Sequence, residues 1–371
     1  MKFSIDKNTL QTTLQLLSKA IPARSTLPII SCALFTHKDN NLFIRTTDLE
    51  ISINLNCNVE NGEDGCVAIP LNKLLEITNA MPNNKIAFNI SDIGKVNIEC
   101  NSGTYTIMGQ PHEEFPSEQQ IENGQTLVFS GKELKSIIQD TSYAASRDDL
   151  KPVLQGVLFQ VESDGFVSVA TDGHRLVKLE KKQIHSLDYT GAVVVPTKFL
   201  SLISSQLNEE DQVSMLIGEN HIQVQLDDVV ITSRIIKDPY PDYEGVIPKD
   251  NTKTLIINKE HFTDAIKRVS IFSNKASRQI ALELSENSMT ITTEDPENIT
   301  TGKEIIDCDY DGEPMTIGYN ASYLSEVLQH QQSEEIKIML KSPLNAGLFM
   351  PIEQEESDRQ TTLLMPIRLN D

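Results

Sequence analysis

The chain has no tryptophan, and aromatic residues make up only 5% of its 371 residues. Its five cysteines form no CxxC pair, which gives no sign of a zinc cluster or a disulfide framework. No hydrophobic run resembles a signal peptide or a membrane span. We therefore expect a cytoplasmic protein whose cysteines are reduced core thiols, namely Cys32, Cys57, Cys66, Cys100 and Cys308.

Catalytic motifs are missing as well. The chain contains no GxSxG, HExxH or P-loop, and Ser130-Gly131-Lys132 lacks the upstream glycine spacing of a P-loop. An enzyme stays open as an alternative only through Asp172 and His174, which could form a general-base pair. We expect a protein that is not an enzyme and that needs no cofactor or metal.

The chain has fewer basic than acidic residues: it contains 32 Lys and Arg and 53 Asp and Glu, so its net charge is −21. Affinity for DNA comes mainly from basic groups, so this balance favours, as a second alternative, a scaffold that binds only proteins. A local basic surface can still face DNA, since charges more than about 8 Å away are screened at physiological salt.

The chain does contain a repeated hairpin. Residues 167–179 alternate around the polar turn Thr171-Asp172-Gly173-His174, which predicts two antiparallel strands. Residues 42–51 have the same shape around Asp48, and residues 289–296 around Glu294. The acidic positions are 124 and 122 residues apart, and this regular spacing predicts a threefold internal repeat.

Other elements recur with the hairpin. In each repeat a short strand leads to a helix N-cap, and the first apolar anchor of the helix follows four residues later. The cap and anchor pairs are Asp6 and Leu10, Ser130 and Leu134, and Asn258 and Phe262.

A basic loop, further strands and a second helix complete each repeat. The pattern predicts an α+β fold of three repeated domains, each with two helices packed on about eight antiparallel strands. The predicted boundaries are 1–123, 124–250 and 251–371.

Three copies of one unit without a catalytic motif indicate a scaffold whose geometry is its function. Three motifs refine this expectation: Thr171-Asp172-Gly173-His174-Arg175-Leu176, Tyr240-Pro241-Asp242-Tyr243 and Met365-Pro366-Ile367-Arg368-Leu369. With the triplication, they closely resemble the bacterial DNA sliding clamps, the family of the beta subunit of DNA polymerase III, over the whole chain. The resemblance implies domains of the DNA-clamp type that form half of a ring. Two subunits then join head to tail around duplex DNA, with helices inside and sheets outside.

Basic residues gather on the inferred helices and the adjoining loops, which suits encirclement without sequence readout. The resemblance implies contacts with the DNA backbone in these places. The predicted DNA-binding residues are Arg24, Lys73, Arg147, Lys151, Pro152, Val153 and Lys198. Clamps of this family often carry aromatic residues at the positions of Pro152 and Val153, so base stacking there is not expected.

The resemblance also implies an apolar groove between the second and third domains. This groove receives short linear motifs from the alpha subunit of DNA polymerase III, the clamp loader, other polymerases and repair proteins. In this chain its walls are Leu154, Thr171, Gly173, His174, Arg175, Leu176, Pro241, Val246, Asn320, Tyr323, Leu344, Ala346, Leu363, Pro366, Ile367 and Arg368.

We expect the aliphatic walls of the groove to accept Leu or Phe anchors, and Arg175, Arg368, His174 and Asn320 to fix polar groups of the peptide. Gly245 and the Asn370-Asp371 extension depart from the family pattern. On residue types alone, residues 171–174 are better described as a simple hairpin turn with a capping Asp, and residues 363–369 could be a last edge strand.

For ring closure, the resemblance implies a homodimer interface. It joins Ile271 and Phe272, at the end of the third domain's first helix, to Leu74, Tyr105 and Ile107 of the other subunit. Adjacent apolar residues at a helix end are also consistent with a core position.

Overall fold

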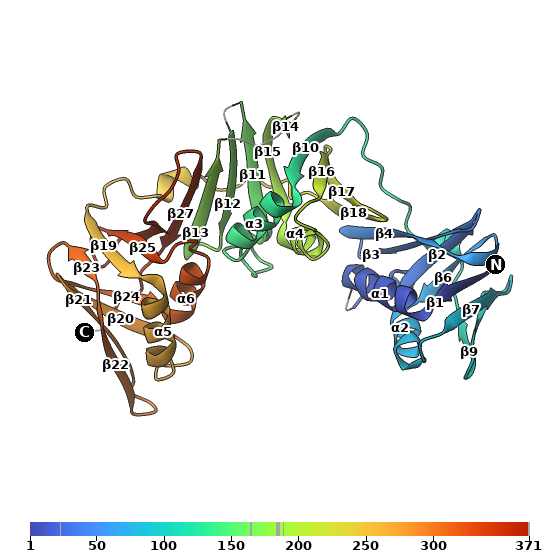
Figure 1. Cartoon of the computed structure of the whole chain (residues 1–371), viewed down its shortest axis with the longest axis horizontal. Helices are drawn as coiled ribbons and strands as arrows, with labels where there is room; N and C mark the ends of the chain where they lie inside the picture. The colour runs from blue at the N-terminus through green and yellow to red at the C-terminus, as the bar shows by residue number, and fades with distance from the viewer. Residues whose placement is uncertain (23, 164, 183–185, 188, 370–371) are drawn as a thin grey trace. The chain divides into compact units, whose positions relative to one another are not determined.

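The computed structural model of the chain describes residues 1–22, 24–163, 165–182, 186–187 and 189–369. Within them the same order of elements occurs three times, each time with two α-helices and nine strands (Figure 1). The α+β class and the two helices per repeat are confirmed, with nine strands instead of about eight. The Asn370-Asp371 extension lies outside the described residues.

The first repeat opens with a strand that runs directly into a helix. The Asp6 carboxylate accepts hydrogen bonds from the backbone N–H groups of Asn8 (2.8 Å) and Thr9 (3.2 Å), which confirms the predicted N-cap. Leu10 is fully buried, as expected of the helix anchor. The elements are β1 (Lys2–Asp6), α1 (Lys7–Leu17), β2 (Cys32–Lys38), β3 (Asn41–Thr47), β4 (Ile51–Asn58), β5 (Glu60–Glu63), β6 (Gly65–Pro70), α2 (Leu71–Ala80), β7 (Lys85–Ile90), β8 (Lys95–Cys100) and β9 (Gly103–Met108).

The second repeat follows the same plan. Its first helix begins at Gly131, whose N–H donates to the carbonyl of Asp211, and the predicted anchor Leu134 is fully buried. The elements are β10 (Gln125–Ser130), α3 (Gly131–Ser142), β11 (Gly156–Glu162), β12 (Gly165–Thr171), β13 (Arg175–Lys181), β14 (Ser186–Leu187), β15 (Gly191–Pro196), α4 (Thr197–Ser204), β16 (Gln212–Ile217), β17 (His221–Leu226) and β18 (Val229–Arg234).

In the third repeat the Asn258 side chain caps the helix by accepting from the N–H of His261 at 3.0 Å, and the anchor Phe262 is fully buried. Both features were predicted. The elements are β19 (Lys253–Asn258), α5 (Lys259–Ser270), β20 (Gln279–Ser285), β21 (Ser288–Asp295), β22 (Thr300–Asp307), β23 (Asp309–Asp311), β24 (Met315–Asn320), α6 (Ala321–Gln329), β25 (Glu335–Leu340), β26 (Gly347–Pro351) and β27 (Asp358–Leu364).

The three predicted hairpins form, but the register of the third corrects the sequence alignment. The last paired residues are Thr47 with Ser52, Thr171 with Leu176, and Asp295 with Thr300. Glu294 is therefore a strand residue, paired with Thr301, and the counterpart of Asp172 is Pro296. Pro296 follows Asp172 by 124 residues, the same period that separates Asp48 from Asp172.

The compact units of the chain do not coincide with its repeats. One unit comprises residues 1–132 and 198–235, and the other comprises residues 133–197 and 236–371. The middle repeat is shared because its strands pair with both other repeats: β18 pairs with β4, and β13 pairs with β27. The predicted domain boundaries after residues 123 and 250 describe where one repeat ends and the next begins, and they remain a prediction.

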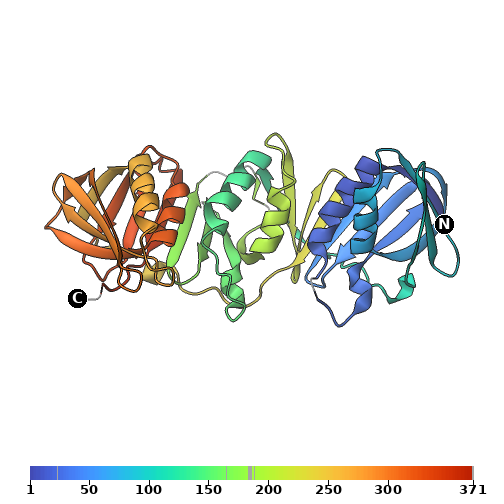
Figure 2. The same cartoon turned by 90° about the horizontal axis from the view of Figure 1, so that it is seen from below.

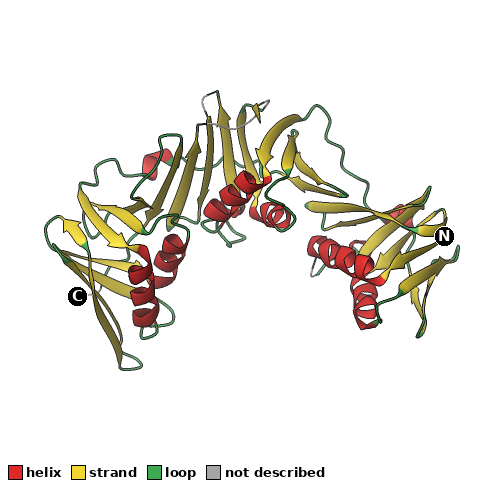
Figure 3. Ribbon diagram, viewed as in Figure 1, coloured by secondary structure: helices red, strands yellow, loops and turns green. Residues whose placement is uncertain are grey.

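In the first unit, one sheet has the order β5-β1-β7-β8-β9, so β9 is an edge strand. A second sheet contains the run β10-β16-β17-β18-β4-β3-β2-β6. Helices α1 and α2 pack against each other (Figure 3).

In the second unit, a nine-stranded sheet has the order β15-β11-β12-β13-β27-β26-β25-β19-β23, and a four-stranded sheet has the order β22-β21-β20-β24. Helices α5 and α6 lie side by side (Figure 2) and contribute Phe262, Ile266 and Leu324 to a core that also contains Tyr319 and Phe349. The pairing of β13 with β27 brings the turn before β13 next to the end of β27.

All five cysteines are free thiols; Cys32 and Cys57 are buried, whereas Cys66, Cys100 and Cys308 are half-buried. Burial raises the pKa of the Cys32 and Cys57 thiols. None of the described helices combines the length and the apolar character needed to span a bilayer.

Candidate functional site

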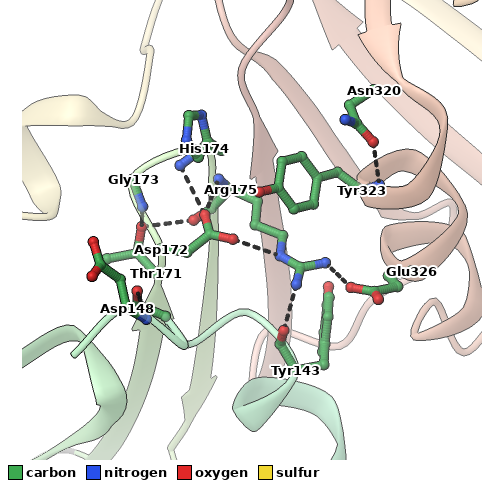
Figure 4. A network of polar contacts seen from close by, with 11 residues as sticks. Tyr143, Asp148, Thr171, Asp172, Gly173, His174, Arg175, Asn320, Tyr323 and Glu326 are labelled. Atoms are coloured by element: carbon green, nitrogen blue, oxygen red, sulfur yellow. Dashed lines mark hydrogen bonds and ion pairs between the residues drawn. The ribbon is translucent and has the colours of Figure 1, made fainter. Parts of the chain in front are cut away.

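The turn between β12 and β13 is stabilised by its own side chains (Figure 4). The Asp172 carboxylate accepts hydrogen bonds from the N–H groups of His174 (2.8 Å) and Arg175 (3.0 Å), and the Thr171 hydroxyl donates to the Arg175 carbonyl (2.6 Å). Gly173 has a φ of +91°, in the region that favours glycine. Asp172 therefore caps the turn and is not paired with the His174 ring as a general base.

Arg175 leaves the turn and is buried, with 6% of its side chain exposed. Its guanidinium forms ion pairs with Asp172 (3.3 Å) and Glu326 and donates to the Tyr143 carbonyl (2.7 Å). We had expected Arg175 to bind polar groups of a peptide. The structure contradicts this role, because the guanidinium is committed to protein groups on three sides.

An apolar floor lies on one face of the nine-stranded sheet, beside the turn. Buried side chains from the neighbouring strands β11, β12, β13, β26 and β27 form it, together with Val194 of β15 and Ala346 just before β26. Three predicted groove residues belong to this floor: Leu176, Ala346 and Leu363.

Three exposed apolar side chains lie within two residues, along the chain, of residues that form or contact the floor. Val246 is 58% exposed, Leu344 64% and Met365 43%, values that are high for large apolar residues on a monomer surface. The predicted groove residue Leu154 is half-buried, and its carbonyl accepts a hydrogen bond from the N–H of Ser146 at 2.8 Å.

The segment 240–247 supplies Pro241 and Val246 and is held on the sheet by its tyrosines. The Tyr240 hydroxyl donates to the Val169 carbonyl (3.4 Å), and the Tyr243 hydroxyl donates to the Gln160 side chain (3.1 Å). Burial raises the pKa of both phenols. Gly245 donates its N–H to the Asp242 carboxylate at 3.2 Å, so its place is within this segment.

Lys178 fastens the same segment to the sheet. Its ammonium lies 2.6 Å from the Glu244 carboxylate and 3.0 Å from that of Glu180. Partial burial disfavours the charged form of Lys178, but hydrogen bonds to Glu244 and Glu180 outweigh this and raise its pKa.

The last described residues close the other side of the floor. The N–H of Met365 donates to the His174 carbonyl (2.8 Å), and the N–H of Ile367 donates to the Gly318 carbonyl (2.9 Å). Pro366 and Ile367 are half-buried, whereas Arg368 is exposed. The chain end therefore continues past β27 along the site and is fastened at both ends.

Asn320 has a different role from the expected one. Its side-chain oxygen accepts from the N–H groups of Ser322 (2.9 Å) and Tyr323 (3.3 Å), and its amide donates to the Ser277 carbonyl (3.1 Å). Asn320 is thus the N-cap of α6, which orients Tyr323 one turn along. The Tyr323 ring stacks on the exposed His174 with ring centroids 5.7 Å apart.

The predicted DNA-binding residues fall into two groups. Arg24, Arg147 and Lys151 are exposed and form no ion pair with the described part of the chain. Lys73, by contrast, lies 3.1 Å from Glu76, and Lys198 is paired with Asp48 of the first hairpin turn. These partners offset the charges of Lys73 and Lys198, which weakens their case as phosphate contacts.

Pro152 and Val153 begin a short 3₁₀ helix, Pro152–Gln155, directly after Lys151. Pro152 is exposed and Val153 is half-buried. Together with Arg147 and Lys151 they form one continuous loop in the second compact unit.

Among the predicted dimer residues, Ile271 is 77% exposed, Phe272 42% and Tyr105 40%, and Ile107 is half-buried. Tyr105 and Ile107 lie on the edge strand β9. Leu74 contradicts the expectation, because it is fully buried on α2. Its i, i+3 and i+4 spacing placed it on the core face of the helix, so it cannot contact another subunit directly.

Some residues of the site carried no signal in the sequence. Tyr143 and His330 stack on each other with centroids 3.9 Å apart, and Glu326 pairs with Arg175. They lie far apart in sequence from the turn and follow no motif, so only the folded chain identifies them.

Family models of the DNA polymerase III beta subunit match nearly the whole chain: the N-terminal domain matches residues 1–119, the central domain residues 129–242 and the C-terminal domain residues 244–368. The chain belongs to the DNA polymerase III beta subunit family. Its function is that of a DNA sliding clamp, a non-catalytic processivity factor that encircles DNA and tethers the polymerase.

Curated sequences named beta sliding clamp match this chain over its full length. The chain is 28% identical to the beta sliding clamp of Vibrio cholerae and 29% identical to that of Escherichia coli, with all of each chain covered.

Solved structures of sliding clamps have the same fold as this chain. The DNA polymerase III subunit beta of Pseudomonas aeruginosa matches with a TM-score of 0.91 at 28% identity, with full coverage of both chains. The sliding clamp of Bartonella birtlesii bound to griselimycin matches with a TM-score of 0.93 at 25% identity, again over both whole chains.

Proposed function

We propose that this chain forms a homodimeric ring around duplex DNA and binds short linear motifs of its partners in the groove described above. The observation that carries the groove is the buried floor of Leu176, Ala346 and Leu363 beside the exposed apolar residues Val246, Leu344 and Met365. The floor itself is already buried, but the exposed side chains of Val246, Leu344 and Met365 cost free energy when they face water, and an extended peptide with apolar anchors would cover them.

The partners we propose are those of the family: the alpha subunit of DNA polymerase III, the clamp loader, and other polymerases and repair proteins. Arg175 and Asn320 act within the protein, so the polar contacts to a peptide come from His174, Arg368 and backbone groups of the turn. The ring would operate in the cytoplasm, where the bacterial chromosome is copied.

Two relatives support the groove, because sliding clamps of Pseudomonas aeruginosa and Bartonella birtlesii have been crystallised with griselimycin, a peptide-like ligand. We therefore expect griselimycin to bind the full chain. Deleting residues 365–371 should abolish that binding, because the deletion removes Met365, Pro366, Ile367 and Arg368 from one side of the floor. Sedimentation should still report the dimer, and unchanged griselimycin affinity would show that the groove lies elsewhere.

The DNA contacts we propose come from Arg24, Arg147 and Lys151, with Lys73 and Lys198 contributing less because their charges are offset.

Encirclement is tested by comparing how long the protein stays on circular and on linear DNA. Once loaded by an ATP-driven clamp loader, the protein should stay on a nicked circular DNA and leave when the circle is linearised. Equally fast loss from both forms would contradict a closed ring.

A further inference from the structure

A column of stacked flat groups runs from inside the second compact unit to the surface of the proposed groove. The ring centroids of His330 and Tyr143 are 3.9 Å apart, and the Arg175 guanidinium lies 5.2 Å from the centroid of Tyr143. On its other side Arg175 lies 4.9 Å from the Tyr323 ring, which stacks at 5.7 Å on His174 (Figure 4). The two Arg175 contacts and the Tyr323–His174 contact are within the ranges of cation–π attraction and aromatic stacking, and the Tyr143 and His330 rings are nearly parallel and closer still.

The inner end of the column is anchored by both the second and the third repeat. Tyr143 directly follows α3, and His330 is the C-cap of α6, where its carbonyl accepts from the Gln360 side chain at 3.0 Å. Next to them, the Gln332 amide donates to the buried carboxylate of Asp140 on α3 at 3.0 Å. The ends of α3 and α6 are thereby held together around the stack.

The outer end of the column consists of two proposed groove residues from different repeats. His174 comes from the turn between β12 and β13, and Tyr323 comes from the first turn of α6. Arg175 connects them, because its charge pairs with Asp172 in the turn and with Glu326 one helical turn after Tyr323. A guanidinium is planar and always charged, so it can stack on both faces and form these ion pairs at once.

We infer that Tyr143, Glu326 and His330 are positioning residues for partner binding. Through Arg175 they hold His174 and Tyr323 at a fixed separation and orientation, although none of the three belongs to the groove itself. The inference rests on the proposed groove. It assigns the recognition of a peptide partner partly to a half-buried stack, whose loss should loosen the groove wall without removing any groove residue.

Griselimycin is the probe, and surface plasmon resonance on the full chain gives its affinity and dissociation rate. Tyr143→Leu removes one ring from the stack, whereas Tyr143→Phe keeps the ring. Glu326→Gln is nearly isosteric and removes the charge that pairs with Arg175. Glu335→Gln is the matched control, because Glu335 is an exposed carboxylate of the same repeat with no ion pair to the described residues.

We expect Glu326→Gln to weaken binding about fivefold and Tyr143→Leu about tenfold, the size of effect that members of one interacting network show. The loss should lie mainly in faster dissociation. Tyr143→Phe and Glu335→Gln should bind like the unaltered chain. Melting temperature and sedimentation are measured for each variant, and Glu326→Gln remains decisive if Tyr143→Leu proves poorly folded.

Two results would overturn the inference. One is unaltered griselimycin binding by Glu326→Gln, and the other is an equal loss in Tyr143→Phe and Tyr143→Leu, which would assign the effect to the hydroxyl and not to the stacked ring. Failure of the unaltered chain to bind griselimycin would reject the groove itself, and the role of the column with it.

Discussion

Replacing Ile271 and Phe272 by alanine should break the proposed ring into monomers. The two side chains follow α5 and are 77% and 42% exposed in the single chain. Complete burial of such a side chain stabilises by about 1.5–3 kcal/mol. Covering only the exposed fractions of Ile271 and Phe272 then contributes about 2.5 kcal/mol to each interface.

A head-to-tail ring of two subunits contains this interface twice, which gives about 5 kcal/mol for the pair of interfaces. Because the alanine methyl groups retain part of this contribution, the double variant should lose about 4 kcal/mol, or about a thousandfold in dimer dissociation constant. Sedimentation velocity over a dilution series measures the constant directly. Circular dichroism should still show a folded chain, since neither side chain belongs to the buried core, although loss of the dimer lowers the melting temperature.

The matched control is Phe43→Ala with Ile352→Ala. These side chains have the same chemistry and are 47% and 39% exposed, but no interface has been assigned to them. The control should dimerise like the unaltered chain. A dissociation constant for Ile271→Ala with Phe272→Ala that matches the control would refute the interface assignment.

Three further expectations concern stability and DNA contact. Gly173→Ala should cost about 1–2 kcal/mol in the free energy of unfolding, because the φ of +91° is unfavourable for a side chain and no atom within 4 Å of the new Cβ compensates or obstructs; denaturant titration measures it, and a neutral effect would contradict the turn geometry. Burial lowers the pKa of His330 below its ordinary 6.5, so the unfolded chain takes up this proton first and stability falls as the pH drops below about 6.5. His330→Phe should melt with a smaller loss between pH 7.5 and 5.5, and equal losses would rule out His330 as the cause. Arg147→Ala with Lys151→Ala should make the logarithm of the DNA affinity fall less steeply with the logarithm of the salt concentration, by the equivalent of up to about two phosphate contacts. An unchanged slope would place the DNA contacts elsewhere.

Much of the fold follows from local chemistry that a sequence displays directly. Caps at Asp6 and Asn258 and apolar anchors four residues later are short-range features, and both caps form as expected. The hairpins were predictable for the same reason, since alternation and turn residues act within about ten residues. The third turn was misplaced because its cap residue is absent: Pro296 stands where Asp48 and Asp172 stand in the other repeats.

Long-range pairing lies beyond such reasoning. The pairing of β18 with β4 and that of β13 with β27 join residues more than a hundred positions apart. Neither the composition nor the repeat period specifies which strands pair across repeats. These two pairings are why the middle repeat is divided between two compact units. The error at Leu74 has a simpler source. Helix periodicity already assigns it to the core face, and the resemblance to a family overrode that signal.

The roles of Arg175 and Asn320 show the limit of carrying residues over from a family resemblance. The resemblance places both in the groove, where their polar groups would contact a peptide, yet one links the turn to α6 and the other caps α6. Buried polar groups must find partners within the protein, and the partners of Arg175 come from residues 143, 172 and 326. A groove between two repeats needs such links, because its two walls belong to elements that only meet in the folded chain. Its affinity for a partner should therefore depend on half-buried residues outside the groove as well as on those that a peptide touches.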